Sequence, residues 1–65
     1  MYRVDFHNQM KVGFSVRART PERAAEKFLA ERRNNPLMRR GCSTNPPVID
    51  ETTGRTVGRV NQFAN

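Results

Sequence analysis

The chain has few of the features that commonly stabilise or anchor small proteins. It has 65 residues and one cysteine, Cys42, so no disulfide can form within it, and a reducing cytoplasm suits it best. It has no run of about 18 apolar residues, as a membrane-spanning helix requires. Its first residues, from Met1 to Asp5, lack the apolar core of a signal peptide. We expect one cytoplasmic domain over residues 1–65 with no membrane partner.

The residues that usually carry catalysis or bind metals are also scarce. There is one histidine beside the single cysteine, whereas a structural zinc site needs about four such ligands at close spacing. The four glycines are scattered and form no phosphate-binding loop. Asp5, His7 and Ser15 resemble an acid–base set, but a flat exposed strand face offers them no pocket. We expect no enzymatic activity, no metal and no cofactor.

Acidic residues are outnumbered two to one. Twelve basic and six acidic side chains give a net charge of +6, and ten of the basic residues are arginine. The imbalance is strongest over residues 32–49, which hold no acid and two arginine pairs, Arg32–Arg33 and Arg39–Arg40. The flat guanidinium group binds phosphate and carboxylate through paired hydrogen bonds, which favours a nucleic acid or an acidic protein surface as partner. A GC-rich genome also enriches arginine, and the sequence does not separate the two explanations.

Two alternating segments open the chain and predict a β-hairpin. Apolar residues occupy every second position over residues 2–6 and again over 12–18, a period typical of strands with one buried face. A three-residue loop would place Phe6 opposite Val12, and a five-residue loop would place it opposite Phe14. A two-residue loop is rejected because it would place Phe6 opposite Lys11.

A helix is expected next. Thr20 suits the N-cap, Pro21 the first helical position and Glu22 the positive end of the helix dipole. The helix should end near Asn34–Asn35, because Pro36 disfavours helical geometry at the residue before it. Its outer face carries charges of both signs, so no recognition helix is evident.

Residues 34–47 are expected to form an irregular loop, with Leu37 and Met38 folded back over the helix end. A second hairpin should follow, with strands around Val48–Asp50 and Thr56–Val60. Gly54 supplies a positive φ in its turn, a bulge is expected near Gly58, and Phe63 is expected under the sheet.

The predicted fold is α+β, a single helix packed on a small, mainly antiparallel four-stranded sheet in the order β-β-α-β-β. The predicted core has few large side chains, so we expect either marginal stability or a homo-oligomer formed along a strand edge or the open sheet face. The expected buried residues are Tyr2, Val4, Phe6, Val12, Phe14, Val16, Ala18, Ala25, Phe28, Leu29, Ile49, Val57 and Val60.

Two basic surfaces are candidate binding sites. The first comprises Arg39 and Arg40 on the long loop, next to Arg32 and Arg33, although these last two also complement the dipole at the helix end. The second is the polar face of the first hairpin, where Lys11, Arg17 and Arg19 share one parity with Arg3, Asp5, His7 and Ser15. Stacking of single-stranded bases is not expected there, since Tyr2, Phe6 and Phe14 have the opposite parity.

The segments Val16–Phe28 and Val48–Gly54 resemble a strand-to-helix junction and a following hairpin in short phage and plasmid accessory proteins of β-β-α-β-β type. The resemblance covers about half of the chain, and it implies this fold and a mobile-element origin without transferring any functional residue.

Together these observations predict a small non-enzymatic binding protein with a basic surface, which contacts nucleic acid or a nucleic-acid-handling complex. The alternative is a phage-type protein-interaction module that inhibits a host enzyme or defence system.

Overall fold

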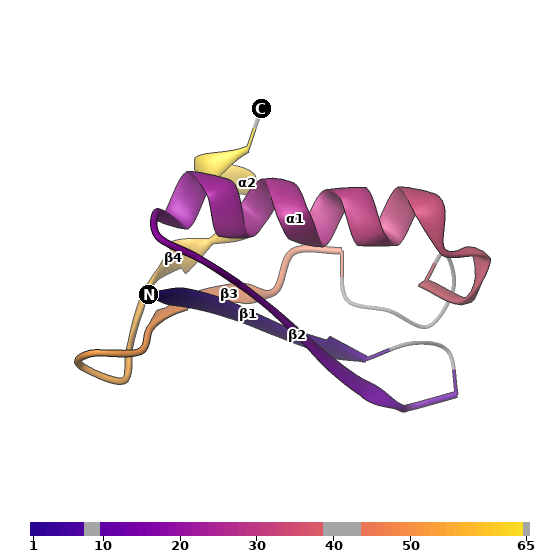
Figure 1. The fold of residues 1–65 in the computed structure, drawn as a ribbon, viewed down its shortest axis with the longest axis horizontal. Helices are drawn as coiled ribbons and strands as arrows, with labels where there is room; N and C mark the ends of the chain where they lie inside the picture. Colours follow the sequence, from indigo (N-terminus) through magenta and orange to yellow (C-terminus); the bar gives the residue numbers. More distant parts are fainter. Residues whose placement is uncertain (8–9, 39–43, 65) are drawn as a thin grey trace.

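The computed structural model describes residues 1–7, 10–38 and 44–64 and shows the predicted α+β fold. Its four strands form one antiparallel sheet in the order β2-β1-β3-β4, and α1 lies across one face of it with α2 beside it (Figure 1). The elements are β1 (Tyr2–His7), β2 (Gly13–Ala18), α1 (Pro21–Asn34), a short 3-10 helix η1 (Pro36–Met38), β3 (Pro47–Asp50), β4 (Arg55–Arg59) and α2 (Val60–Phe63).

The first hairpin has the longer of the two loops considered from the sequence. Phe6 pairs with Phe14 and His7 with Gly13, so residues 8–12 connect the strands. Because paired residues share a face, Val4, Phe6, Phe14 and Val16 lie on the side of α1. The rings of Phe6 and Phe14 stack at 5.9 Å, and Phe28 of α1 meets Phe6 edge-on at 5.0 Å.

The start of α1 is as predicted. Thr20 is the N-cap, and its hydroxyl accepts a hydrogen bond from the backbone N–H of Arg23 at 3.2 Å. Pro21 and Glu22 occupy the first turn, and Arg32 and Arg33 occupy the last. The helix ends at Asn34, one residue before the Asn35 C-cap and two before Pro36, as the proline predicts.

The second hairpin contains the predicted turn and bulge. Gly54 has a φ of 74°, the left-handed conformation that favours glycine. Val48 pairs with Gly58 whereas Ile49 pairs with Thr56, so Val57 is the extra residue of a bulge next to Gly58. Within the expected irregular loop, the described residues include η1, and β3 starts at Pro47.

The short helix α2 was not predicted, and it accounts for the burial of Val60. Its Phe63 packs beside α1 and over Gly58, on the helix-covered face of the sheet. A Cβ atom at Gly58 would lie 2.8 Å from Cε2 of Phe63 and 2.6 Å from Oε1 of Gln62. Glycine at this position therefore lets the end of the chain approach β4 closely.

The core is smaller than the sequence predicted. Val12, Phe14 and Val57 were expected to be buried but are 52%, 40% and 43% exposed. Ile49 is half-buried and pairs with Arg3, so it lies on the face away from α1, and its neighbour Val48 is buried opposite Val4 in its place. The buried apolar residues in the described ranges are Val4, Phe6, Ala18, Ala24, Ala25, Phe28, Met38, Val48 and Val60.

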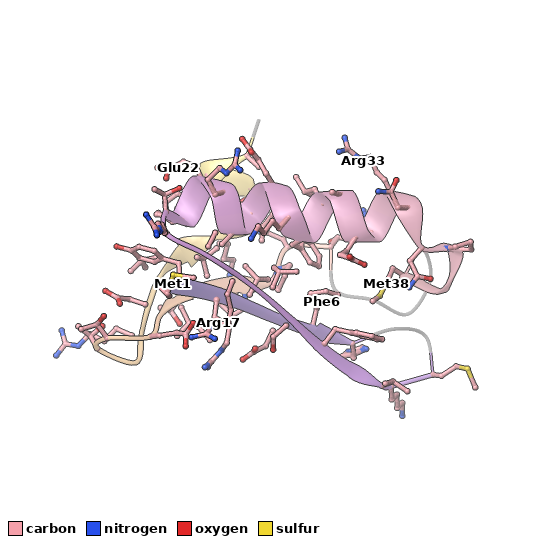
Figure 2. The ribbon with its side chains drawn as sticks, in the orientation of Figure 1. Met1, Phe6, Arg17, Glu22, Arg33 and Met38 are labelled. Carbon is pink, nitrogen blue, oxygen red and sulfur yellow. The ribbon has the colours of Figure 1, made fainter. Side chains whose placement is uncertain are left out.

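Met38 covers the C-terminal end of α1 as predicted, with its side chain directed between helix and sheet (Figure 2). The side chain of Leu37, for which the same role was expected, lies outside the described parts. None of the described helices is both long enough and apolar enough to cross a bilayer.

Candidate functional site

The open face of the sheet has less uncompensated positive charge than its sequence suggested. Arg3 Nε lies 3.0 Å from Asp5 Oδ1, and the Ser15 hydroxyl donates to the same carboxylate at 2.7 Å. Arg17 points away from α1 (Figure 2) and donates two hydrogen bonds to Glu51, at 2.7 and 3.0 Å. Arg3 and Arg17 are therefore already engaged by carboxylates of the same chain, and this face presents little net charge to a phosphate.

The Arg17–Glu51 contact also changes how both groups ionise. The hydrogen bond from Arg17, supported by its positive charge, lowers the pKa of the Glu51 carboxyl below its ordinary value of 4.5. The same contact raises the pKa of Arg17. Both groups stay charged at neutral pH, so the carboxylate of Glu51 neutralises Arg17 on this face.

Two other residues expected on this face lie beyond its strand. Lys11 and Arg19 flank β2 on either side, so the alternation of the strand does not fix their direction. Lys11 has a φ of 63° in the hairpin connection, and Arg19 lies in the bend before α1. Both are exposed, but they stand at opposite ends of β2 and do not form one patch with Arg17.

Arg19 instead joins two cations that the sequence analysis did not select. Arg23 and Lys27 are one helical turn apart on α1, and with Arg19 they line a depression of about 300 Å³ above Ala18. Lys27 Nζ donates to the Arg17 carbonyl at 2.7 Å, which places this side of α1 toward β2. We call Arg19, Arg23 and Lys27 the basic row.

The basic row is exposed and carries uncompensated charge. All three side chains are exposed, and neither Arg19 nor Arg23 makes a salt bridge within the described ranges. Lys27 and Glu31 are correctly spaced for a helical ion pair, but the lysine contacts the strand backbone instead. The row is therefore available to an external anion.

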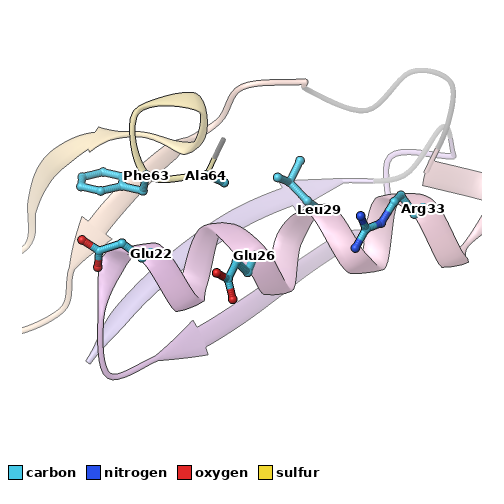
Figure 3. Close-up of a pocket in the computed structure, with 6 residues that line it drawn as sticks. All are labelled: Glu22, Glu26, Leu29, Arg33, Phe63 and Ala64. Carbon is cyan, nitrogen blue, oxygen red and sulfur yellow. The ribbon is translucent and has the colours of Figure 1, made fainter.

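Two of the three acidic residues of α1 border a second groove, beside α2. Glu22 and Glu26, together with Leu29, Phe63, Ala64 and Arg33, line a groove of about 430 Å³ (Figure 3). The outer face of α1 nevertheless carries both signs of charge, as the sequence indicated, because Glu26 also lines a hollow with Arg23 and Lys27. Arg33 also borders both this groove and the hollow lined by Arg23, Glu26 and Lys27.

The two arginine pairs predicted from the sequence to form a binding surface are not equally described by the structure. Arg32 is half-buried, and its Nε atom is enclosed with no hydrogen-bond partner in the described part of the chain, consistent with its stem packing on the inner side of α1. Arg33 is exposed on the same helical turn, so the two do not form one surface. Arg39 and Arg40, the pair favoured from the sequence, lie outside the described residues.

A sequence signal for the basic row did exist. Arg19, Arg23 and Lys27 recur every four residues, the interval that aligns side chains along a helix. It was missed because Glu22, Glu26 and Glu31 are interleaved with them and because Arg19 precedes the helix. Among the described residues, no three His, Cys, Asp or Glu side chains are grouped to hold a metal ion.

Comparison with protein-family models, curated proteins and solved structures finds no match for this chain. The resemblance to phage and plasmid accessory proteins therefore stays a prediction from the sequence.

Proposed function

We propose that this chain is a non-enzymatic cytoplasmic protein that binds nucleic acid through the basic row on α1. The observation that carries the proposal is the grouping of Arg19, Arg23 and Lys27 around one exposed depression whose described lining contains no acidic residue. A row of cations attracts the phosphate backbone and gains affinity by releasing its counterions.

The mode of binding follows from what surrounds the row. Its lining contains three cations with Met1 and Ala18, and the aromatic rings of Phe6 and Phe28 are buried. Without an aromatic side chain in this lining, phosphate contacts dominate and base stacking does not contribute. We therefore propose recognition of the backbone without strong sequence preference. Arg39 and Arg40 remain, from the sequence, candidates for further phosphate contacts.

Fluorescence anisotropy with a labelled random-sequence duplex, as DNA and as RNA, tests the proposal at low salt. The diagnostic variant is Arg19→Gln/Arg23→Gln, which removes two charges of the row and touches no described ion pair. A matched control is Arg3→Gln/Arg55→Gln, which removes the same charge from the sheet face and the second hairpin. The proposal predicts a large loss of affinity in the first variant and a small loss in the second.

Equal losses in both variants would mean that only net charge matters and would refute the assignment to the row. Absence of binding by the unmodified chain at low salt would refute nucleic-acid binding altogether. Circular dichroism of each variant confirms that the comparison is between folded proteins.

A further inference from the structure

The strand β2 is an edge of the sheet with one neighbour, β1. Edge strands expose backbone hydrogen-bonding groups and invite pairing with another chain unless the protein protects them. The opposite edge, β4, is protected by the bulge at Val57 and by a charged residue at each end, Arg55 and Arg59. By contrast, β2 pairs with β1 in unbroken register over all six of its residues and contains no proline.

Apolar side chains are exposed along this edge. Met10, Val12 and Phe14 are 71%, 52% and 40% exposed; Phe14 lies in β2, and Met10 and Val12 lie in the residues leading into it, on either side of Lys11 with its positive φ. Phe14 stacks on Phe6 with one side of its ring, which leaves the other side toward solvent. Five large apolar residues in the described ranges are exposed, and three of the five belong to this stripe.

The charges around β2 leave its first half open. Lys27 covers the carbonyl of Arg17 near the C-terminal end of the strand, and the Arg17 side chain is turned to Glu51 across the open sheet face. No charged side chain is present from Val12 to Val16. The accessible part of the edge is therefore short, apolar and uncharged.

The size of the domain favours a second copy as the occupant. Three of the nine buried apolar residues are alanine, so the hydrophobic core is thin for a 65-residue chain. Small domains with little core commonly gain stability by oligomerisation. A strand paired antiparallel with its own copy forms a closed two-fold interface, in which each copy covers the apolar stripe of the other.

We propose that this chain forms a homodimer by antiparallel pairing of β2 with β2 of a second copy, centred on Phe14. The two sheets join into one, and Val12, Phe14 and Val16 lie beside their counterparts on the face that carries the helices. Only about five residues of each strand pair, so the dimer is in concentration-dependent exchange with the monomer.

The dimer also affects the basic row, a step that rests on the proposed function. An antiparallel two-fold keeps both α1 helices on the same face of the joined sheet, and each presents the Lys27 side toward β2. The two rows then flank the junction between the copies and form one basic surface with six cations. Because the rows repel one another, a bound polyanion strengthens the dimer.

Sedimentation of the full chain over a range of concentrations at moderate salt, without nucleic acid, tests the dimer. Val12→Glu places a charge on the stripe, and Val57→Glu places the same charge on a valine of the other edge that is 43% exposed, against 52% for Val12. We expect the unmodified chain to dimerise. Val12→Glu should weaken the dimer at least about tenfold, or ~1.4 kcal/mol, and Val57→Glu should have little effect.

Amide exchange gives a second reading that does not depend on the variants. Protection of Gly13–Val16 should rise with protein concentration, and that of β4 should not. The proposed dimer would be overturned if the chain stayed a monomer at all concentrations. It would also be overturned if Val12→Glu and Val57→Glu weakened dimerisation equally. If the chain dimerises but does not bind nucleic acid, the proposed function is refuted and the edge pairing stands. If the chain binds nucleic acid but stays a monomer, the edge pairing is refuted and the proposed function stands.

Discussion

Replacing Gly58 with alanine perturbs the contact that holds α2 against the sheet. The new methyl group would meet Gln62 Oε1 at 2.6 Å and Phe63 Cε2 at 2.8 Å, both closer than carbon atoms tolerate. Overpacking of this kind costs about 1–3 kcal/mol, and we expect about 1–2 kcal/mol because Phe63 is half-buried in a short helix that can shift. At about 4–8 °C per kcal/mol, the melting temperature should fall by ~4–16 °C.

Thermal unfolding followed by circular dichroism measures this loss. Gly13→Ala is the matched control, because a Cβ there meets nothing within 4 Å, so its melting temperature should be unchanged or slightly raised. In a Phe63→Leu background the smaller side chain should remove part of the cost of Gly58→Ala, as expected for residues in contact. If the Gly58→Ala and Gly13→Ala variants had the same melting temperature, the close packing of α2 on β4 would be contradicted.

Three further changes test the interactions that build the domain. Thr20→Ala should lower stability by about 1 kcal/mol by removing the N-cap bond to Arg23, whereas Thr52→Ala, in an exposed turn, should have little effect in the same urea titration. Phe28→Ala should cost about 3–5 kcal/mol, comparable to the total of ~3–10 kcal/mol for this length, so a cooperative thermal transition should be lost. Glu51 has a lowered pKa in the folded state, so its contribution is present above pH 4.5 and is lost as the pH falls through that lowered pKa; melting temperatures should therefore decline less on acidification for Glu51→Gln.

The elements that were predicted correctly are those specified by neighbouring residues. Thr20 and Pro21 define the start of α1, and Gly54 defines the second turn, because capping and turn geometry depend on a few consecutive positions. Alternation in β1 and β2 also restricted the register to two choices, of which the structure has the one with the longer loop.

The features that were missed depend on residues distant in sequence. Alternation cannot decide whether Val48 or Ile49 faces the core, since that depends on the pairing of β3 with β1. The exposure of Phe14 follows from where α1 crosses the sheet. The engagement of Arg17 depends on Glu51, 34 residues away.

The binding surface illustrates the same limit. From the sequence, Arg17 and Arg19 formed one patch because they share parity on an extended strand. The strand ends at Ala18, so Arg17 belongs to the sheet face and Arg19 to the row on α1. Where a strand passes directly into a helix, a shift of one residue in the boundary changes the neighbours of a charged side chain.

The salt dependence of nucleic-acid binding tests the central claim most directly. Each phosphate contact contributes about −0.9 to the slope of log K against log salt on duplex DNA, so the basic row alone gives about −2.7 and ~40-fold weaker binding between about 50 and 200 mM salt. Arg19→Gln/Arg23→Gln should make the slope shallower by about 1.8, and Arg3→Gln/Arg55→Gln should leave it nearly unchanged. An unchanged slope in the first variant would contradict the assignment of binding to α1.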